Sequence, residues 1–145
     1  MRKTILTVLA LAAASVCAAG TWDPFDESAF EAARKQGKLI LLQFTADGCF
    51  LCNDQEGVLV RVLQRPELKN VSGFRVDEEA SKDIVRRLRI NGLSTLVLLK
   101  GDKELNRAAG IASESDILAF LMLASPEKIQ GRHKSRPSNR TPPRP

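Results

Sequence analysis

Two of the chain's three cysteines lie in one short segment, Thr45-Ala46-Asp47-Gly48-Cys49-Phe50-Leu51-Cys52-Asn53. An apolar run, Leu39 to Phe44, precedes this segment, and Asp54 to Leu63 follows it with apolar residues at helical spacing. The pattern predicts a buried strand that turns into a helix. A Cys-x-x-Cys at such a turn is typical of a redox site.

The two cysteines are expected to have different roles. At a helix N-terminus, unpaired backbone N–H groups and the helix dipole stabilise negative charge, and the thiolate is the reactive form of cysteine. Cys49 is therefore predicted to be the nucleophile. Cys52 lies one turn further along and is predicted to resolve the mixed disulfide that Cys49 forms.

Other interpretations of the pair are a zinc site and a purely structural disulfide. Zinc usually takes four ligands, and the only other Cys or His residues are Cys17 and His133, both outside the expected domain. No metal site is therefore predicted within one chain, although a metal shared by the dithiols of two copies stays open. A structural disulfide across so short a ring would constrain little chain entropy, so redox chemistry is favoured.

The 145 residues predict one domain with an extension at each end. Residues 1–19 resemble a secretory signal peptide, with Arg2 and Lys3, then an apolar stretch, then small residues for cleavage after Ala18 or Ala19. A lipid-anchored Cys17 is the alternative. Residues 20–130 are expected to form the domain and residues 131–145 a basic disordered tail. A cleaved signal predicts a periplasmic or secreted protein.

The net charge of +5 is located at the two ends of the chain. The signal region contributes two positive charges and the tail five, which leaves residues 20–130 with a net charge of −2. The domain itself is therefore mildly acidic, and no nucleic-acid partner is predicted. The tail either solubilises the protein or contacts an anionic lipid or acidic partner.

The remaining elements follow from periodicity and turn residues. Asp23 is expected to cap a first helix that begins at Pro24 and ends at Gly37. Gly57 lies inside the helix after Cys52, where it marks a possible kink. Later elements are a strand at 73–77, a helix at 80–89, strands at 95–99 and 105–109, and a helix that begins at Ser113. The fold class is α/β, a mixed four-stranded sheet with helices on both faces.

Two segments, Ala46-Asp47-Gly48-Cys49-Phe50-Leu51-Cys52 and Ile90-Asn91-Gly92-Leu93-Ser94-Thr95-Leu96, resemble the thioredoxin superfamily, and the resemblance covers residues 22–124. The sequence resembles secreted bacterial thioredoxin-like proteins and the C-terminal domain of the thiol–disulfide interchange reductase of the bacterial inner membrane. The resemblance implies a thioredoxin-like fold with sheet order 2-1-3-4 and an active site at the carboxyl end of the first strand. It implies no cofactor beyond a redox-active disulfide.

Three positions depart from the family pattern. Gly48 stands in place of a tryptophan, Gln43 in place of a buried acid, and Ser94 in place of the cis-proline before Thr95. A cis peptide before a non-proline residue costs about 2.5–4 kcal/mol, so Leu93–Ser94 is either trans with an altered loop or cis and strained. In the family this loop, here Leu93, Ser94 and Thr95, offers its backbone to the substrate.

Two functions are compatible with these residues. The first is a periplasmic thiol–disulfide oxidoreductase, a disulfide reductase that acts as a monomer on protein or small-molecule disulfides and receives electrons from a membrane-bound donor. Because Gln43 cannot carry charge, solvent or a carboxylate such as Asp47 would then activate Cys52. The second is a non-catalytic binding or scaffold module, which the changes at Gln43 and Ser94 favour. The intact Cys49–Cys52 pair favours the oxidoreductase.

Overall fold

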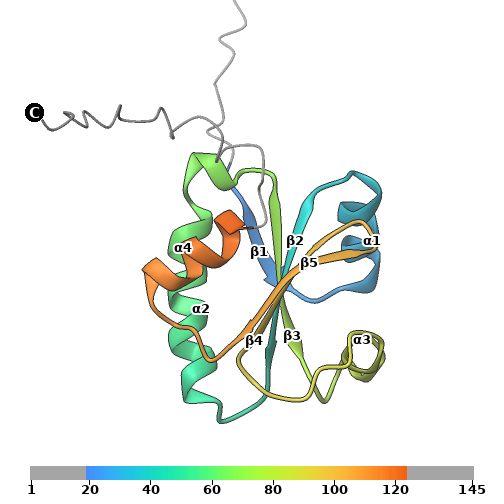
Figure 1. Cartoon of the computed structure of the whole chain (residues 1–145). Helices are drawn as coiled ribbons and strands as arrows, with labels where there is room; N and C mark the ends of the chain where they lie inside the picture. The colour runs from blue at the N-terminus through green and yellow to red at the C-terminus, as the bar shows by residue number, and fades with distance from the viewer. Residues whose placement is uncertain (1–18, 124–145) are drawn as a thin grey trace, which may run out of the picture.

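The computed structural model describes residues 19–123, which form a five-stranded sheet with helices on both faces (Figure 1). The strands are β1 (Thr21–Pro24), β2 (Leu39–Thr45), β3 (Val71–Asp77), β4 (Thr95–Lys100) and β5 (Lys103–Ala109). The helices are α1 (Glu27–Lys35), α2 (Phe50–Leu63), α3 (Lys82–Arg87) and α4 (Glu114–Leu123), with a 3-10 turn, η1, at Pro66–Leu68. The predicted signal peptide and basic tail lie outside the described residues.

The strand order is β1-β3-β2-β4-β5. β2 pairs in parallel with β3 and antiparallel with β4, and β4 pairs antiparallel with β5. The four strands predicted from sequence therefore have the expected order, 2-1-3-4, and the α/β class is confirmed. The fifth strand, β1, pairs in parallel with the outer side of β3 and was not predicted.

The predicted start of the first helix at Asp23 and Pro24 is wrong. Both residues belong to β1, and α1 begins only at Glu27, where the carboxylate of Asp26 accepts the Ala29 N–H at 2.8 Å. Proline is acceptable in a strand at the sheet edge, because its missing N–H can face away from the ladder. The pairing of β1 with β3 takes Asp23 into the sheet, and Asp26 caps the helix in its place.

Trp22 fixes β1 to the rest of the fold. A side chain at Gly73 on β3 would place its Cβ 2.5 Å from the Trp22 ring, so the ring lies directly over the glycine backbone. The Trp22 indole N–H donates to Glu56 of α2 at 3.0 Å. Besides its strand pairing with β3, β1 is thus held by one close packing contact and one side-chain hydrogen bond.

The sheet separates two hydrophobic cores. Leu41, Leu96 and Leu98 face α2 and α4, whereas Ile40, Leu42 and Phe44 face α1 and α3. Figure 1 shows α2 and α4 on one face of the sheet and α1 and α3 on the other. Full burial of each such side chain is worth about 1.5–3 kcal/mol. The position of α2, and with it of the two cysteines, is therefore set by its predicted apolar stripe, which includes Leu59, Val62 and Leu63.

Two other helix boundaries match the sequence, whereas those of α3 differ. Gly37 ends α1 at a φ of +66°, and the Ser113 hydroxyl oxygen accepts the Asp116 N–H at 3.2 Å at the start of α4. α3 is shorter than predicted because the carboxylate of Asp77 holds the N–H groups of Glu79 and Ala80 in a turn. Within residues 19–123, no helix combines the length and apolarity needed to cross a membrane.

Candidate active site

The disulfide between Cys49 and Cys52 lies where β2 ends and α2 begins. Between β2 and α2 the chain turns through Gly48, whose φ is +78°. A residue with a side chain adopts this left-handed conformation only at a cost, and glycine adopts it freely. The backbone conformation therefore explains why glycine, and not the family's tryptophan, stands at position 48. It delivers Cys49 to the N-cap position of α2.

The two sulfur atoms differ in environment. Cys49 is half-buried, and its Sγ accepts the backbone N–H of Cys52 at 3.2 Å. Cys52 is 1% exposed, and its Sγ lies 3.8 Å from the carbonyl oxygen of Phe44 on β2. After reduction, the N–H and the helix N-terminus would stabilise negative charge on Cys49, and the Phe44 oxygen would be an acceptor for the Cys52 S–H. This asymmetry is what the predicted roles require.

Gln43 lies beneath the disulfide on β2 and is completely buried. Its side-chain amide donates to the Cys52 carbonyl oxygen at 2.8 Å and to the Gln55 side-chain oxygen at 2.9 Å. The structure therefore places Gln43 next to Cys52, as the resemblance to the family implied. An amide carries no charge at any pH, so this position offers hydrogen bonds and no proton.

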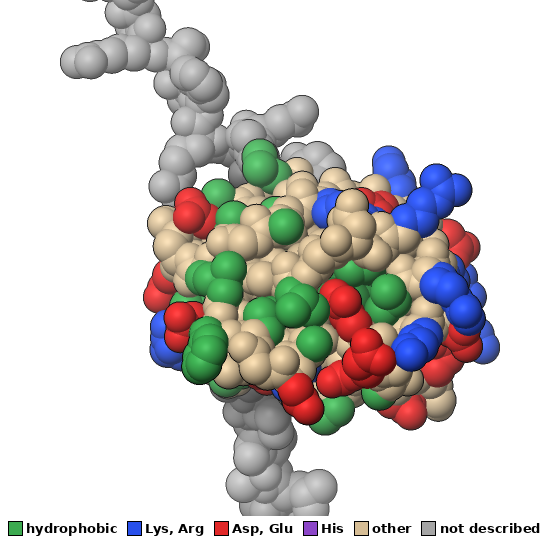
Figure 2. Space-filling view, turned by 90° about the horizontal axis from the view of Figure 1, so that it is seen from below, with side chains coloured by type: hydrophobic (Ala, Val, Ile, Leu, Met, Phe, Trp, Pro, Cys, Tyr) green, Lys and Arg blue, Asp and Glu red, His purple; other side chains and the backbone are tan. Residues whose placement is uncertain are grey.

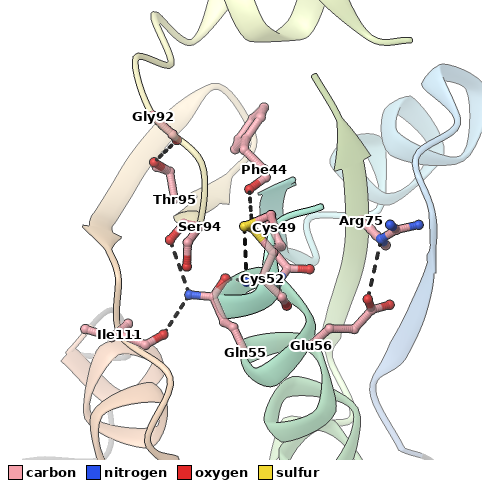
Figure 3. The surroundings of a disulfide bond; sticks show 11 residues. Phe44, Cys49, Cys52, Gln55, Glu56, Arg75, Gly92, Ser94, Thr95 and Ile111 are labelled. Carbon is pink, nitrogen blue, oxygen red and sulfur yellow. Dashed lines mark hydrogen bonds and ion pairs between the residues drawn. A yellow bond between two sulfur atoms is a disulfide. The ribbon is translucent and has the colours of Figure 1, made fainter. Parts of the chain in front are cut away.

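Gln55 is a site residue that the sequence interpretation missed. It is completely buried on α2, and its Nε2 donates to the carbonyl oxygens of Ser94 at 3.3 Å and Ile111 at 2.7 Å (Figure 3). The available signal was its position: it follows Cys52 by three residues and precedes Leu59 by four, on the inward stripe of the helix. A glutamine at such a position must find buried partners.

The loop of Leu93, Ser94 and Thr95 lies against the disulfide, as expected, with an altered backbone. No peptide bond among the described residues is cis, so Leu93–Ser94 is trans. Ser94 is 3% exposed at a φ of +57°, and its N–H donates to the Phe44 carbonyl oxygen at 2.9 Å. The Thr95 hydroxyl donates to the Gly92 carbonyl oxygen and stabilises the turn (Figure 3).

A charged pair lies on the other side of α2. Glu56 accepts the Trp22 indole N–H through one oxygen and pairs with Arg75 through the other at 3.4 Å (Figure 3). Arg75 is opposite Gln43 in the β2–β3 register. The sequence interpretation missed this pair, because Glu56 and Arg75 come from two separate elements and Trp22, which also bonds Glu56, from a third. Asp47, the carboxylate proposed from sequence, is exposed in the turn before Cys49.

The surface around the disulfide is apolar with acidic neighbours. Phe50 is 83% exposed, Leu51 43% and Leu93 42%, on both sides of Cys49. Figure 2 views the molecule from the end where α2 begins, and hydrophobic side chains gather in the middle of this face beside acidic ones. Among residues 19–123, His, Cys, Asp and Glu side chains form no group of three or more that could hold a metal ion.

Burial raises the pKa of the Glu78 carboxyl group, and the neighbouring carboxylates of Glu79 and Asp77 raise it further. Glu78 follows β3 directly and donates its N–H to the Thr45 carbonyl oxygen at the end of β2. A carboxyl group beside the end of β2 is thus more readily protonated than usual.

Known proteins are similar to this chain in sequence and in fold. The thioredoxin family model matches residues 23–122. A thioredoxin H-type of Fagopyrum esculentum is 27% identical over 113 residues, which cover 78% of this chain and 94% of that protein. The structure of Trxlp from Edwardsiella tarda gives a TM-score of 0.66 at 29% identity and covers 70% of this chain and 98% of that one. The thioredoxin of Malassezia sympodialis gives 0.63 at 18% identity, over 74% and 93%, a likeness of fold alone.

The matched residues run from β1 into α4 and include the disulfide, the buried position 43 and the Ser94 turn. Fold, sequence match and site geometry agree. The chain therefore belongs to the thioredoxin family, and its Cys49–Cys52 pair is that of a thiol–disulfide oxidoreductase.

Proposed function

We propose that the protein is a disulfide reductase in which Cys49 attacks and Cys52 resolves. The observation that carries this proposal is the asymmetry of the pair: the accessible sulfur of Cys49 accepts an N–H at a helix N-terminus, and the Cys52 sulfur is buried behind it. A substrate sulfur can reach only Cys49. A thiolate at that position has backbone stabilisation that Cys52 lacks.

The reaction balances in two exchange steps. The Cys49 thiolate attacks one sulfur of a substrate disulfide, a Cys49–substrate disulfide forms, and the other substrate sulfur leaves as a thiolate. Cys52 then loses its proton to solvent and attacks the Cys49 sulfur, which releases the second substrate thiolate. Two electrons pass to the substrate, and an external dithiol must return two electrons to the Cys49–Cys52 disulfide.

The face around Cys49 supports protein disulfides as substrates. Phe50, Leu51 and Leu93 form an apolar rim that would pack against residues flanking the substrate cysteine. In the family the loop before β4 offers backbone groups to a substrate. Here the Ser94 N–H is already bonded to Phe44. Leu93 is the exposed residue of this loop.

The test is reduction of insulin by residues 20–130 in the presence of dithiothreitol. We expect turnover above the dithiothreitol background, with Cys49→Ser as the inactive control. A wild-type rate equal to background would overturn the reductase and favour the alternative, a binding module. The replacement of the buried acid by Gln43 and of the cis-proline by Ser94 supports that alternative.

Location and partners are part of the same proposal. The signal-like residues 1–19 support export to the periplasm, where a membrane-bound donor would supply the electrons and the protein would act as a monomer. Fractionation of cells that express the full chain tests the location. Recovery of the uncleaved chain in the cytoplasm would contradict it.

A further inference from the structure

Gln43 and Gln55 form a buried amide pair in which every amide hydrogen has an acceptor. The Gln55 amide uses its two hydrogens on the carbonyl oxygens of Ser94 and Ile111, so its oxygen must face Gln43. The Gln43 amide uses its two hydrogens on that oxygen and on the Cys52 carbonyl oxygen. The orientation of both side chains is therefore fixed by their partners.

These contacts close a ring around the resolving cysteine. Cys52 is bonded through its carbonyl oxygen to Gln43, Gln43 to Gln55, and Gln55 to the Ser94 carbonyl oxygen. The Ser94 N–H then bonds the Phe44 carbonyl oxygen, which lies 3.8 Å from the Cys52 sulfur. Figure 3 shows Gln55 directed from α2 toward Ser94 and Ile111, away from Glu56.

We propose that Gln55 is a positioning residue for the resolving step. It holds the Ser94 turn and, through Gln43, the first turn of α2 in the relation that lets Cys52 attack the sulfur of Cys49. It does this with groups that do not titrate, so Gln43 and Gln55 themselves add no pH dependence to the resolving step. The proposal rests on the assignment of Cys52 as the resolving thiol, which belongs to the proposed function.

The role is specific to the second exchange step. Attack by Cys49 depends on its exposure and on the Cys52 N–H, neither of which involves Gln55. Attack by Cys52 requires its buried sulfur, which is held within the ring, to reach the sulfur of Cys49. Loss of Gln55 should therefore slow resolution and leave the first attack unchanged.

The experiment uses Ellman's reagent, an aromatic disulfide, with the reduced protein. The Cys49 thiolate attacks it and releases one aromatic thiolate, and Cys52 then displaces the second as the Cys49–Cys52 disulfide forms. Stopped-flow absorbance separates the two releases. Because any reactive dithiol gives both, the measurement does not depend on the physiological substrate.

The first variant is Gln55→Leu, which keeps the volume and removes the hydrogen bonds. We expect the second release to slow by about tenfold, which corresponds to the free energy of one or two buried hydrogen bonds. The first release should remain as in wild type. Gln64→Leu, at the exposed end of the same helix, is the matched control and should change neither release. An unchanged second release in Gln55→Leu would overturn the proposal.

The second variant, Gln55→Glu, distinguishes positioning from a merely structural role. Its ionised carboxylate cannot donate to the Ser94 and Ile111 oxygens, whereas the protonated form has one donor. Burial against two carbonyl oxygens should raise the pKa of this carboxyl group. The ratio of the variant's second release to that of wild type should therefore be near one at acidic pH and fall as pH rises.

A ratio that is independent of pH would contradict the positioning role, even if both variants unfold more easily. Failure of the proposed function is a separate result. In that case wild type does not reduce insulin, although the two releases can still differ between wild type and Gln55→Leu. If Gln55→Leu does not fold, Gln55→Glu at acidic pH keeps the test available.

Discussion

The two turns that face each other at the disulfide are held in place in different ways. The turn before α2 depends on neighbours in sequence: Gly48 supplies the left-handed backbone, and the Cys52 N–H bonds to Cys49. The Ser94 turn depends on distant residues, because Phe44 accepts its N–H and Gln55 and Gly110 donate to its carbonyl oxygen. Local sequence thus determines the thiol chemistry, and tertiary contacts determine the loop that a substrate would meet.

The largest expected effect tests the turn before α2, whose structure local sequence determines. Cys49→Ser should abolish reductase activity and form no mixed disulfide, because the accessible sulfur is lost. Cys52→Ser should also be inactive in turnover, and it should accumulate mixed disulfides with substrate. Mass spectrometry of adducts formed under limiting reagent measures both. Preferential labelling of Cys52 in the reduced wild type would reverse the assignment.

The second prediction tests the Ser94 turn, which tertiary contacts hold in place. Ser94→Pro should lower the free energy of unfolding by about 3 kcal/mol or more, since proline cannot adopt a φ of +57° and has no N–H for Phe44. Ser94→Gly is the matched control and should be neutral or stabilising by about 1 kcal/mol, because glycine tolerates that φ. Urea unfolding measures both. A stabilised Ser94→Pro would mean that the loop rearranges readily.

The third prediction tests Gln43, which connects the two turns through its hydrogen bonds to Cys52 and Gln55. Gln43→Glu would place a carboxylate against the oxygens of Cys52 and Gln55, at a cost of about 2–3 kcal/mol at neutral pH. Because the pKa of this buried carboxyl group should be raised, the deficit should be smallest below its unfolded pKa and grow as pH rises through the folded pKa. Urea unfolding at acidic and neutral pH tests this, with Gln64→Glu as the exposed control.

Two glycines separate local from tertiary effects. Gly73→Ala should destabilise the fold by about 1–2 kcal/mol, because its Cβ would lie 2.5 Å from the Trp22 ring and 2.9 Å from the Thr21 oxygen. Gly57→Ala should stabilise α2 by up to about 1 kcal/mol, because its Cβ meets only the tip of Arg61 at 3.8 Å. Thermal unfolding should therefore show a lower Tm for Gly73→Ala and a higher Tm for Gly57→Ala than for wild type.

The smallest effect concerns Glu78. Because burial, Glu79 and Asp77 raise the pKa of its carboxyl group, the folded state binds this proton more tightly than the unfolded state. The contribution of this group to stability is fully present below its unfolded pKa and is lost as pH rises through the raised pKa. Glu78→Gln should therefore raise Tm slightly at pH 7, and the gain should vanish in acid. An equal gain at both pH values would assign it to packing.

Sequence predicted the parts of this protein that are encoded locally. The apolar runs gave β2 and β4, the helical stripe gave α2, and the cysteine spacing gave the disulfide. β1 was missed because Trp22 and Pro24 are ordered by β3 and Glu56, which are distant in sequence. Ser94 was identified as a departure, although its trans, left-handed backbone follows from partners that no local pattern contains.

Gln55 shows a second limit of the sequence. Its position on the inward stripe of α2 was visible, but its acceptors, Ser94 and Ile111, come from two loops that approach α2 only in the folded chain. A buried amide can be suspected from periodicity, whereas its partners cannot be named. The proposed positioning role therefore needed the structure.

The edges of the sheet bear on self-association. β1 has only four residues, and Pro24 at its end lacks a donor for another strand. β5, at the opposite edge, carries Lys103, Glu104 and Arg107 with exposed side chains. A strand from a second copy would have to bring charged side chains together or leave hydrogen bonds unmade. Growth of the sheet from copy to copy is thus disfavoured at both edges, which would help the protein to stay dispersed while it exchanges disulfides.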